Sequence, residues 1–111
     1  MNQVAVIHSA FEDAPQTVAF VNVDEREGMD ALEYAYRVTQ NIEGSWSKGP
    51  TIQWEGKEMP NEDYNEDVTV MAALPVMDGV EYGLRSTSMG DQMLLGNKKY
   101  KVAMVGFKEV I

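Results

Sequence analysis

Alternating apolar and polar residues open the chain and predict two β-strands. In QVAVIHSAF, the residues Val4, Val6 and His8 share one face of an extended segment, because successive side chains of a strand point to opposite sides. TVAFVNVDE predicts a second strand from Thr17 to Val23. EDAP between the two is typical of a turn, so residues 1–23 are expected to form a hairpin with a rather long loop.

The period then changes from two to about 3.6 and predicts one helix over residues 29–42. The stripe of that helix would consist of Leu32, Ala35, Tyr36, Thr39 and Ile42. Acidic residues cluster near its start, where the helix dipole favours them, and Gly44 is the predicted stop.

The second half of the chain predicts further strands around an irregular acidic segment at residues 43–67. Within that segment TIQWEGKEM predicts a short hairpin or an edge strand around Glu55-Gly56, and VTVMAALPV predicts a central strand over residues 68–76. A turn at Asp78-Gly79 follows, and residues 92–107 predict a closing hairpin that turns at 96–99. Three methionines on these strands are expected in the core: Met71, Met93 and Met104. The prediction is a single α+β domain spanning residues 1–111, with an antiparallel sheet of five to six strands and one amphipathic helix.

Charge adds a second constraint, because it is large and unevenly placed. The net charge of the 111 residues is −9; residues 1–84 hold 16 acids and 4 bases, whereas residues 85–111 hold 2 acids and 5 bases. An acidic body repels phosphate backbones and attracts basic partners, so direct nucleic-acid binding is not expected. The alternative is that the negative surface only maintains solubility.

The chain has no cysteine, its N-terminus has no basic region typical of a signal peptide, and no stretch is long and apolar enough to span a membrane. These features predict a cytoplasmic protein without membrane contact. The single histidine, His8, has no nucleophile or acid at a spacing typical of catalysis, so no catalytic residue and no cofactor are predicted. NEDYNED offers four carboxylates but lacks the alternation and central glycine of a calcium loop, so no metal site is predicted either.

Two surfaces remain as candidates for binding. RSTSMGD places a cation beside three hydroxyls and a turn, which favours a small anion site made by Arg85, Ser86, Thr87, Ser88 and Asp91. The alternative is that the hydroxyls satisfy backbone groups where strands change direction, with Gly90 at a tight turn. The irregular segment supplies a second set, which would contact a protein partner: Trp46, Trp54, Glu62, Asp63, Glu66 and Asp67. The two tryptophans would equally serve as lids over the core.

ALEYAYRVTQNIEGSW and RSTSMGDQMLLGNKKYKVAMVGFKEV together resemble a group of small, mostly uncharacterised proteins of bacteria, phages and plasmids. Members join a helix ending near T-x-N-x-x-x-x-W to a C-terminal RSTSVGD and a hairpin ending in GF. The matching positions cover about half the chain and are Thr39, Asn41, Trp46, Arg85, Ser86, Thr87, Ser88, Gly90, Asp91, Gly106 and Phe107, with Met89 in place of the usual valine. The resemblance implies a bacterial or mobile-element setting and a shared fold, without an activity.

Charge and resemblance together favour an acidic, non-enzymatic interaction protein. It would be a phage or mobile-element accessory factor that binds and inhibits a host protein with a basic surface. The host protein would act in defence or in nucleic-acid processing. In the sharper version of this hypothesis, the chain inhibits that protein by mimicking nucleic acid. The alternative is a small-ligand protein that binds phosphate or a nucleotide at residues 85–91. A homodimer stays open, because the basic C-terminal hairpin of one copy would complement the acidic body of another.

Overall fold

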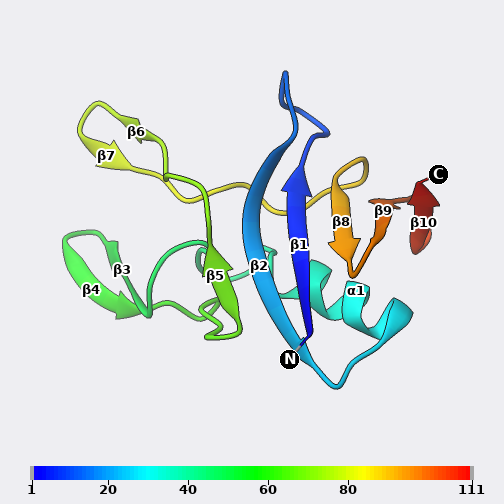
Figure 1. Ribbon diagram of the computed structural model, residues 1–111. Helices are drawn as coiled ribbons and strands as arrows, with labels where there is room; N and C mark the ends of the chain where they lie inside the picture. The colour runs from blue at the N-terminus through cyan, green and yellow to red at the C-terminus, as the bar shows by residue number, and fades with distance from the viewer. Residues whose placement is uncertain (1, 111) are drawn as a thin grey trace.

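A long antiparallel hairpin forms the middle of the fold (Figure 1). The computed structural model describes residues 2–110, and its first two strands are β1 (Asn2–His8) and β2 (Gln16–Asp24), as the alternation predicted. On the other side of β1 lie β8 (Gln92–Leu95), β9 (Lys98–Val102) and β10 (Phe107–Val110), which give a six-stranded antiparallel sheet in the order β10-β9-β8-β1-β2-β5. The predicted α+β fold, with one helix and five to six antiparallel strands, is confirmed.

The helix α1 (Gly28–Arg37) packs against one face of this sheet. Ala31, Leu32 and Ala35 are buried in a shared core with valines from β1 and β2, because a helix whose apolar residues recur every three to four positions presents them as one stripe. Within residues 2–110, no helix is both long and apolar enough to cross a membrane.

The helix ends five residues earlier than predicted. The Thr39 hydroxyl donates to the Ala35 carbonyl oxygen at 2.8 Å, and the Gln40 side-chain amide donates to the Tyr36 carbonyl oxygen at 3.0 Å. Side chains therefore satisfy the carbonyls of the last turn, and the backbone leaves the helix to contact residues 84–87. As a consequence Ile42, predicted on the buried stripe, is exposed.

The apolar run at 68–76 was wrongly predicted as a central strand. It forms only β5 (Val68–Val70), at the edge of the sheet and paired with β2 alone. The place beside β1 is taken by β8, which follows later in the chain and aligns Met93 with Val6. An apolar run indicates burial or strand tendency but not which neighbours the strand obtains.

Two small hairpins project from the β5 side of the sheet, away from β8–β10 (Figure 1). The first comprises β3 (Thr51–Trp54) and β4 (Lys57–Pro60), which is the hairpin of the two predicted alternatives. The second comprises β6 (Val76–Met77) and β7 (Val80–Glu81), joined by the predicted turn at Asp78-Gly79. Of the three methionines expected in the core, Met93 is fully buried, whereas Met71 and Met104 are exposed. Met71 directly follows the edge strand β5, and Met104 lies in the loop between β9 and β10.

Candidate functional site

The RSTSMGD string leads from the β6–β7 hairpin back to the sheet and ends at Asp91, directly before β8. The Asp91 carboxylate is fully buried and accepts backbone N–H hydrogen bonds from Ser9, Ala10 and Ser88 at 2.8–2.9 Å. Burial on its own raises the pKa of Asp91. The hydrogen bonds from Arg85 and from the three N–H groups outweigh it, and the pKa falls to about 2. Asp91 is therefore ionised in the folded protein at neutral pH.

The Arg85 guanidinium is fully engaged with protein acceptors. It donates two hydrogen bonds to Asp91, at 2.7 and 2.8 Å, two to Glu12, at 3.2 and 2.8 Å, and one to the Ser86 carbonyl oxygen at 2.9 Å. These bonds use all five N–H donors that an arginine has. The exposed Phe11 ring lies against the same group, with its ring centre 4.9 Å from Cζ of Arg85. The hydrogen bonds to Asp91 raise the pKa of Arg85.

This geometry puts a condition on the predicted anion site. Arg85 contributes one positive charge, and Asp91 and Glu12 contribute two negative charges within hydrogen-bond distance of it. An incoming phosphate would have to displace the part-exposed Glu12 carboxylate from the guanidinium. The hydroxyls are engaged as well: Ser86 accepts the Asn41 N–H at 2.8 Å, and Ser88 donates to the Ser86 carbonyl oxygen at 3.2 Å. These contacts match the alternative in which the hydroxyls hold a change of chain direction.

A buried chain of hydrogen bonds runs from β1 to the end of the helix. Because the Thr39 hydroxyl donates to Ala35, it accepts from the Thr87 hydroxyl at 2.8 Å, and Thr87 in turn accepts from His8 Nε2 at 3.0 Å. His8 therefore carries a proton on Nε2. Burial lowers the pKa of His8, mainly through desolvation, which the buried Asp91 charge partly opposes. The one histidine of the chain thus has a structural role.

The two sequence halves on which the family resemblance depends contact each other. The indole Nε1 of Trp46 donates to the Arg85 carbonyl oxygen at 2.9 Å, and the Asn41 amide donates to the Leu84 carbonyl oxygen at 2.9 Å. Trp46 is buried, with its ring edge-on to that of His8 at 6.2 Å. Its indole offers no free surface to a partner as the fold stands, so of the two predicted roles the structure places it in the core.

The acidic residues of NEDYNED divide into two groups. The Asp63 carboxylate accepts the N–H groups of Ile42, Glu43 and Gly44, with distances of 2.7–3.3 Å, and Asp67 accepts the Tyr34 hydroxyl. Glu62 and Glu66 are exposed. Alternate acids thus hold the loop or face solvent. Among residues 2–110, no three histidine or acidic side chains are placed to hold a metal ion together.

Trp54 lies apart from Trp46, on the projecting β3–β4 hairpin, and its side chain is 63% exposed. It lines a shallow pocket of about 280 Å³ with Ile52, Met59, Pro60, Glu43 and Glu62. Trp54 and Glu62 were predicted from the sequence as contact residues, whereas the other four were not. Ile52 and Met59 are cross-strand partners, and such a pair is predictable only once the register of the hairpin is known.

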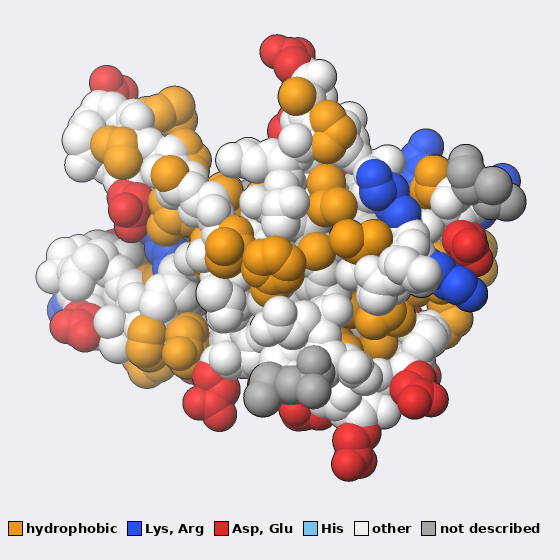
Figure 2. Space-filling model, viewed as in Figure 1, with side chains coloured by type: hydrophobic (Ala, Val, Ile, Leu, Met, Phe, Trp, Pro, Cys, Tyr) orange, Lys and Arg blue, Asp and Glu red, His pale blue; other side chains and the backbone are white. Residues whose placement is uncertain are grey.

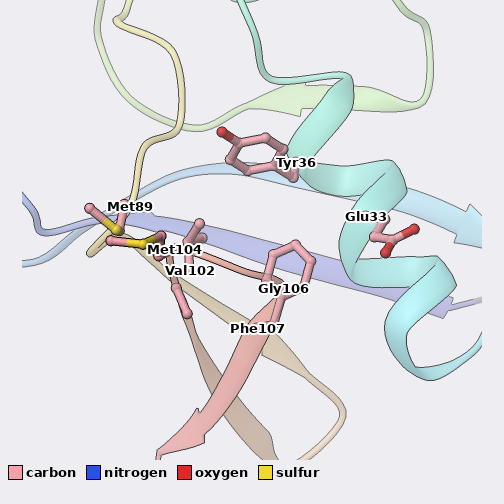
Figure 3. A pocket seen from close by; sticks show the side chains of 8 residues that line it. Glu33, Tyr36, Met89, Val102, Met104, Gly106 and Phe107 are labelled. Carbon is pink, nitrogen blue, oxygen red and sulfur yellow. The ribbon is translucent and has the colours of Figure 1, made fainter.

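A second pocket, of about 480 Å³, lies between α1 and the β9–β10 hairpin (Figure 3). Tyr36 and Phe107 meet edge-on at 6.2 Å, Met89 and Met104 approach from the other side, and Glu33 is the only charged side chain in the lining. This pocket is not predictable from a short stretch of sequence, because its lining comes from the helix, from the RSTSMGD turn and from the last hairpin. Its volume lies within the range of small-molecule sites.

Comparison with models of known protein families, with curated proteins and with solved structures finds no match. The resemblance to proteins with an RSTSVGD-type motif therefore stays a prediction, as do the functions that it favoured.

Proposed function

We propose that this chain is a non-enzymatic interaction protein that binds the basic surface of a protein partner. The observation that carries the proposal is the composition of the side of the molecule formed by the two projecting hairpins. Residues 48–84 hold eight acidic side chains and two lysines, Lys48 and Lys57. Two of these acids, Asp63 and Asp67, accept hydrogen bonds within the fold. Large apolar side chains are exposed among them: Trp54, Met59, Val76, Met77, Val80 and Tyr82.

The exposed apolar side chains favour a binding surface, and the acidic ones determine which charge the partner should carry. Isolated exposed apolar residues are ordinary, but several together on acidic, projecting elements are typical of contact with a partner. A groove between the hairpins connects them as one surface. Its lining includes apolar residues (Ile52, Leu74 and Val80) and one charge of each sign (Lys48 and Glu81). Figure 2 shows hydrophobic side chains on both arms, whereas lysines and arginines gather mainly over the C-terminal strands at the opposite end.

The resemblance to bacterial, phage and plasmid proteins supports a host protein of bacteria as the partner, with inhibition of a defence or nucleic-acid-processing protein as the consequence. In the sharper form of the proposal, the outward carboxylates stand in for phosphates in a nucleic-acid groove. That form predicts that DNA or RNA competes with this chain for the partner, whereas a partner that holds both at once would refute mimicry.

The proposal is tested by capture from a bacterial lysate on the immobilised chain at low and high salt, followed by affinity measurements with each purified protein retained. We expect a partner whose retention falls as salt rises, because attraction between exposed charges is screened. Trp54→Ala should weaken its binding at least tenfold, as for an exposed aromatic anchor. Phe11→Ala is the matched control, because Phe11 is also a largely exposed aromatic residue but lies on the β1–β2 loop. Capture of no salt-sensitive partner, or equal losses for the two variants, would refute the proposal.

A further inference from the structure

The pocket beside Trp54 combines apolar walls with two carboxylates. Ile52 and Met59 face each other across β3 and β4, and Trp54, two residues further along β3, lies on the same face of the hairpin. Pro60 completes the apolar lining, and the pocket measures about 280 Å³. Glu43 and Glu62, both exposed, contribute the charged part of the lining.

Internal hydrogen bonds fix the two carboxylate-bearing segments relative to each other. Asp63 binds the N–H groups of Ile42, Glu43 and Gly44, which sets the backbone turn that carries Glu43. The buried Asn61 amide donates to the Ser45 carbonyl oxygen at 2.7 Å and to the Gly49 carbonyl oxygen at 2.8 Å. Residues 61–63 therefore hold residues 42–49 in place, so the pocket is formed before any ligand arrives, which reduces the entropic cost of binding.

The charge of the pocket selects its occupant. Within residues 2–110, neither Glu43 nor Glu62 forms a salt bridge, and two carboxylates at one pocket repel an anion and attract a cation. An indole face attracts a cation as well, and a guanidinium also stacks on it. Apolar walls suit a methylene stem rather than a bare ion. The volume lies just below the range of drug-sized ligand sites, about 300–1,000 Å³, and fits a single side chain.

We infer that this pocket binds one arginine side chain of the partner, with its stem against Ile52 and Met59 and its guanidinium between the Trp54 face and the two carboxylates. The inference rests on the proposed function and names the group that the acidic side recognises. Lys57, the cross-strand partner of Trp54, does not line the pocket, and 63% of the Trp54 side chain is exposed.

The test is a titration of the full chain with the blocked tripeptide Gly-Arg-Gly, followed by the NMR signals of the two indole N–H groups. We expect the Trp54 signal to shift and the Trp46 signal to stay, because Trp46 is buried and bonded to Arg85. Blocked Gly-Gln-Gly should cause no shift. The double variant Glu43→Gln/Glu62→Gln should weaken binding of the arginine peptide at least tenfold. Glu66→Gln, which neutralises an exposed acid of the same loop outside the pocket, should leave binding unchanged.

Equal shifts with both peptides, no shift at Trp54, or unchanged binding by the double variant would overturn the inference. Its failure is distinguishable from failure of the proposed function. If a captured partner binds the double variant as well as the natural chain, the interaction stands and the arginine pocket does not. If Gly-Arg-Gly shifts Trp54 in the predicted way while no partner is captured, the pocket stands and the proposed function does not.

Discussion

Replacing Asp91 with asparagine should destabilise the fold strongly, although the two side chains have nearly the same shape. Asp91 is fully buried, and its two oxygens accept five hydrogen bonds, from Arg85 and from the N–H groups of Ser9, Ala10 and Ser88. Asparagine has only one acceptor oxygen, and its NH₂ group would face donors that have lost their acceptor. Arg85 would keep Glu12 as its only carboxylate partner.

The size of the loss follows from two independent arguments. A pKa of about 2, against an ordinary value of 3.8, corresponds to about 2.5 kcal/mol in favour of the ionised group in the folded state. Removal of one partner from a buried ion pair costs about 3–5 kcal/mol in other proteins. We therefore expect a loss of about 3 kcal/mol from a total stability on the order of 5–15 kcal/mol. For a domain of this length, that lowers Tm by about 12 °C.

Urea unfolding, followed by the fluorescence of the two tryptophans, measures this loss directly. The matched control is Glu12→Gln, which alters the other carboxylate on the same guanidinium. The Glu12 side chain is 29% exposed, and ion pairs near solvent contribute little, so the control should cost at most about 1 kcal/mol. A loss below about 1 kcal/mol for Asp91→Asn, or equal losses for the two variants, would show that the buried pair does not hold this turn in place.

Three further changes test the same region. Stability should fall as pH decreases through about 6.5, because burial lowers the pKa of His8 in the folded state and the unfolded chain therefore takes up the proton first. Urea unfolding midpoints measured from pH 7.5 to 5 should show this decrease, and His8→Gln should reduce it. A decrease that His8→Gln leaves unchanged would assign the pH dependence to other groups. Thr87→Val should lower the free energy of unfolding by about 1–3 kcal/mol, because His8 and Thr39 both lose a hydrogen-bond partner, whereas Thr87→Ser should retain most of the stability. A valine variant as stable as the natural chain would contradict the inferred hydrogen-bond chain. Gly90→Ala should destabilise the fold by more than about 1 kcal/mol, because φ is +97° and the new Cβ would lie 3.1 Å from the Cβ of Ala10. Gly96→Ala, where φ is +61° and the space around the residue is open, should lower the stability measured by thermal unfolding by less. Equal losses for the two variants would show that the close contact with Ala10 does not matter.

The local part of the fold was predictable because its causes lie within a few residues. Alternation identified β1 and β2, the helical period identified the start of α1, and turn residues identified the β3–β4 and β6–β7 hairpins. Each of these signals depends on neighbours that the chain itself places close together.

The errors came where distant segments compete. The end of α1 and the position of β5 depend on contacts with residues 84–87 and on the order of strands around β1, neither of which is visible in a short window. The candidate sites show the same division. The string RSTSMGD was conspicuous, but Glu12, which completes the environment of Arg85, is 73 residues away from it.

The sequence by itself determined the fold class, the negative charge and its concentration before residue 85, because composition and local period carry that information. Only the tertiary structure decided which polar groups make hydrogen bonds within the fold and which face solvent. It pairs Arg85 with Asp91 and Glu12, buries Trp46 and exposes Trp54 beside Glu43 and Glu62. A side chain is available to a partner only when no distant part of the same chain has already satisfied or covered it, and that depends on long-range packing rather than on neighbours in the sequence.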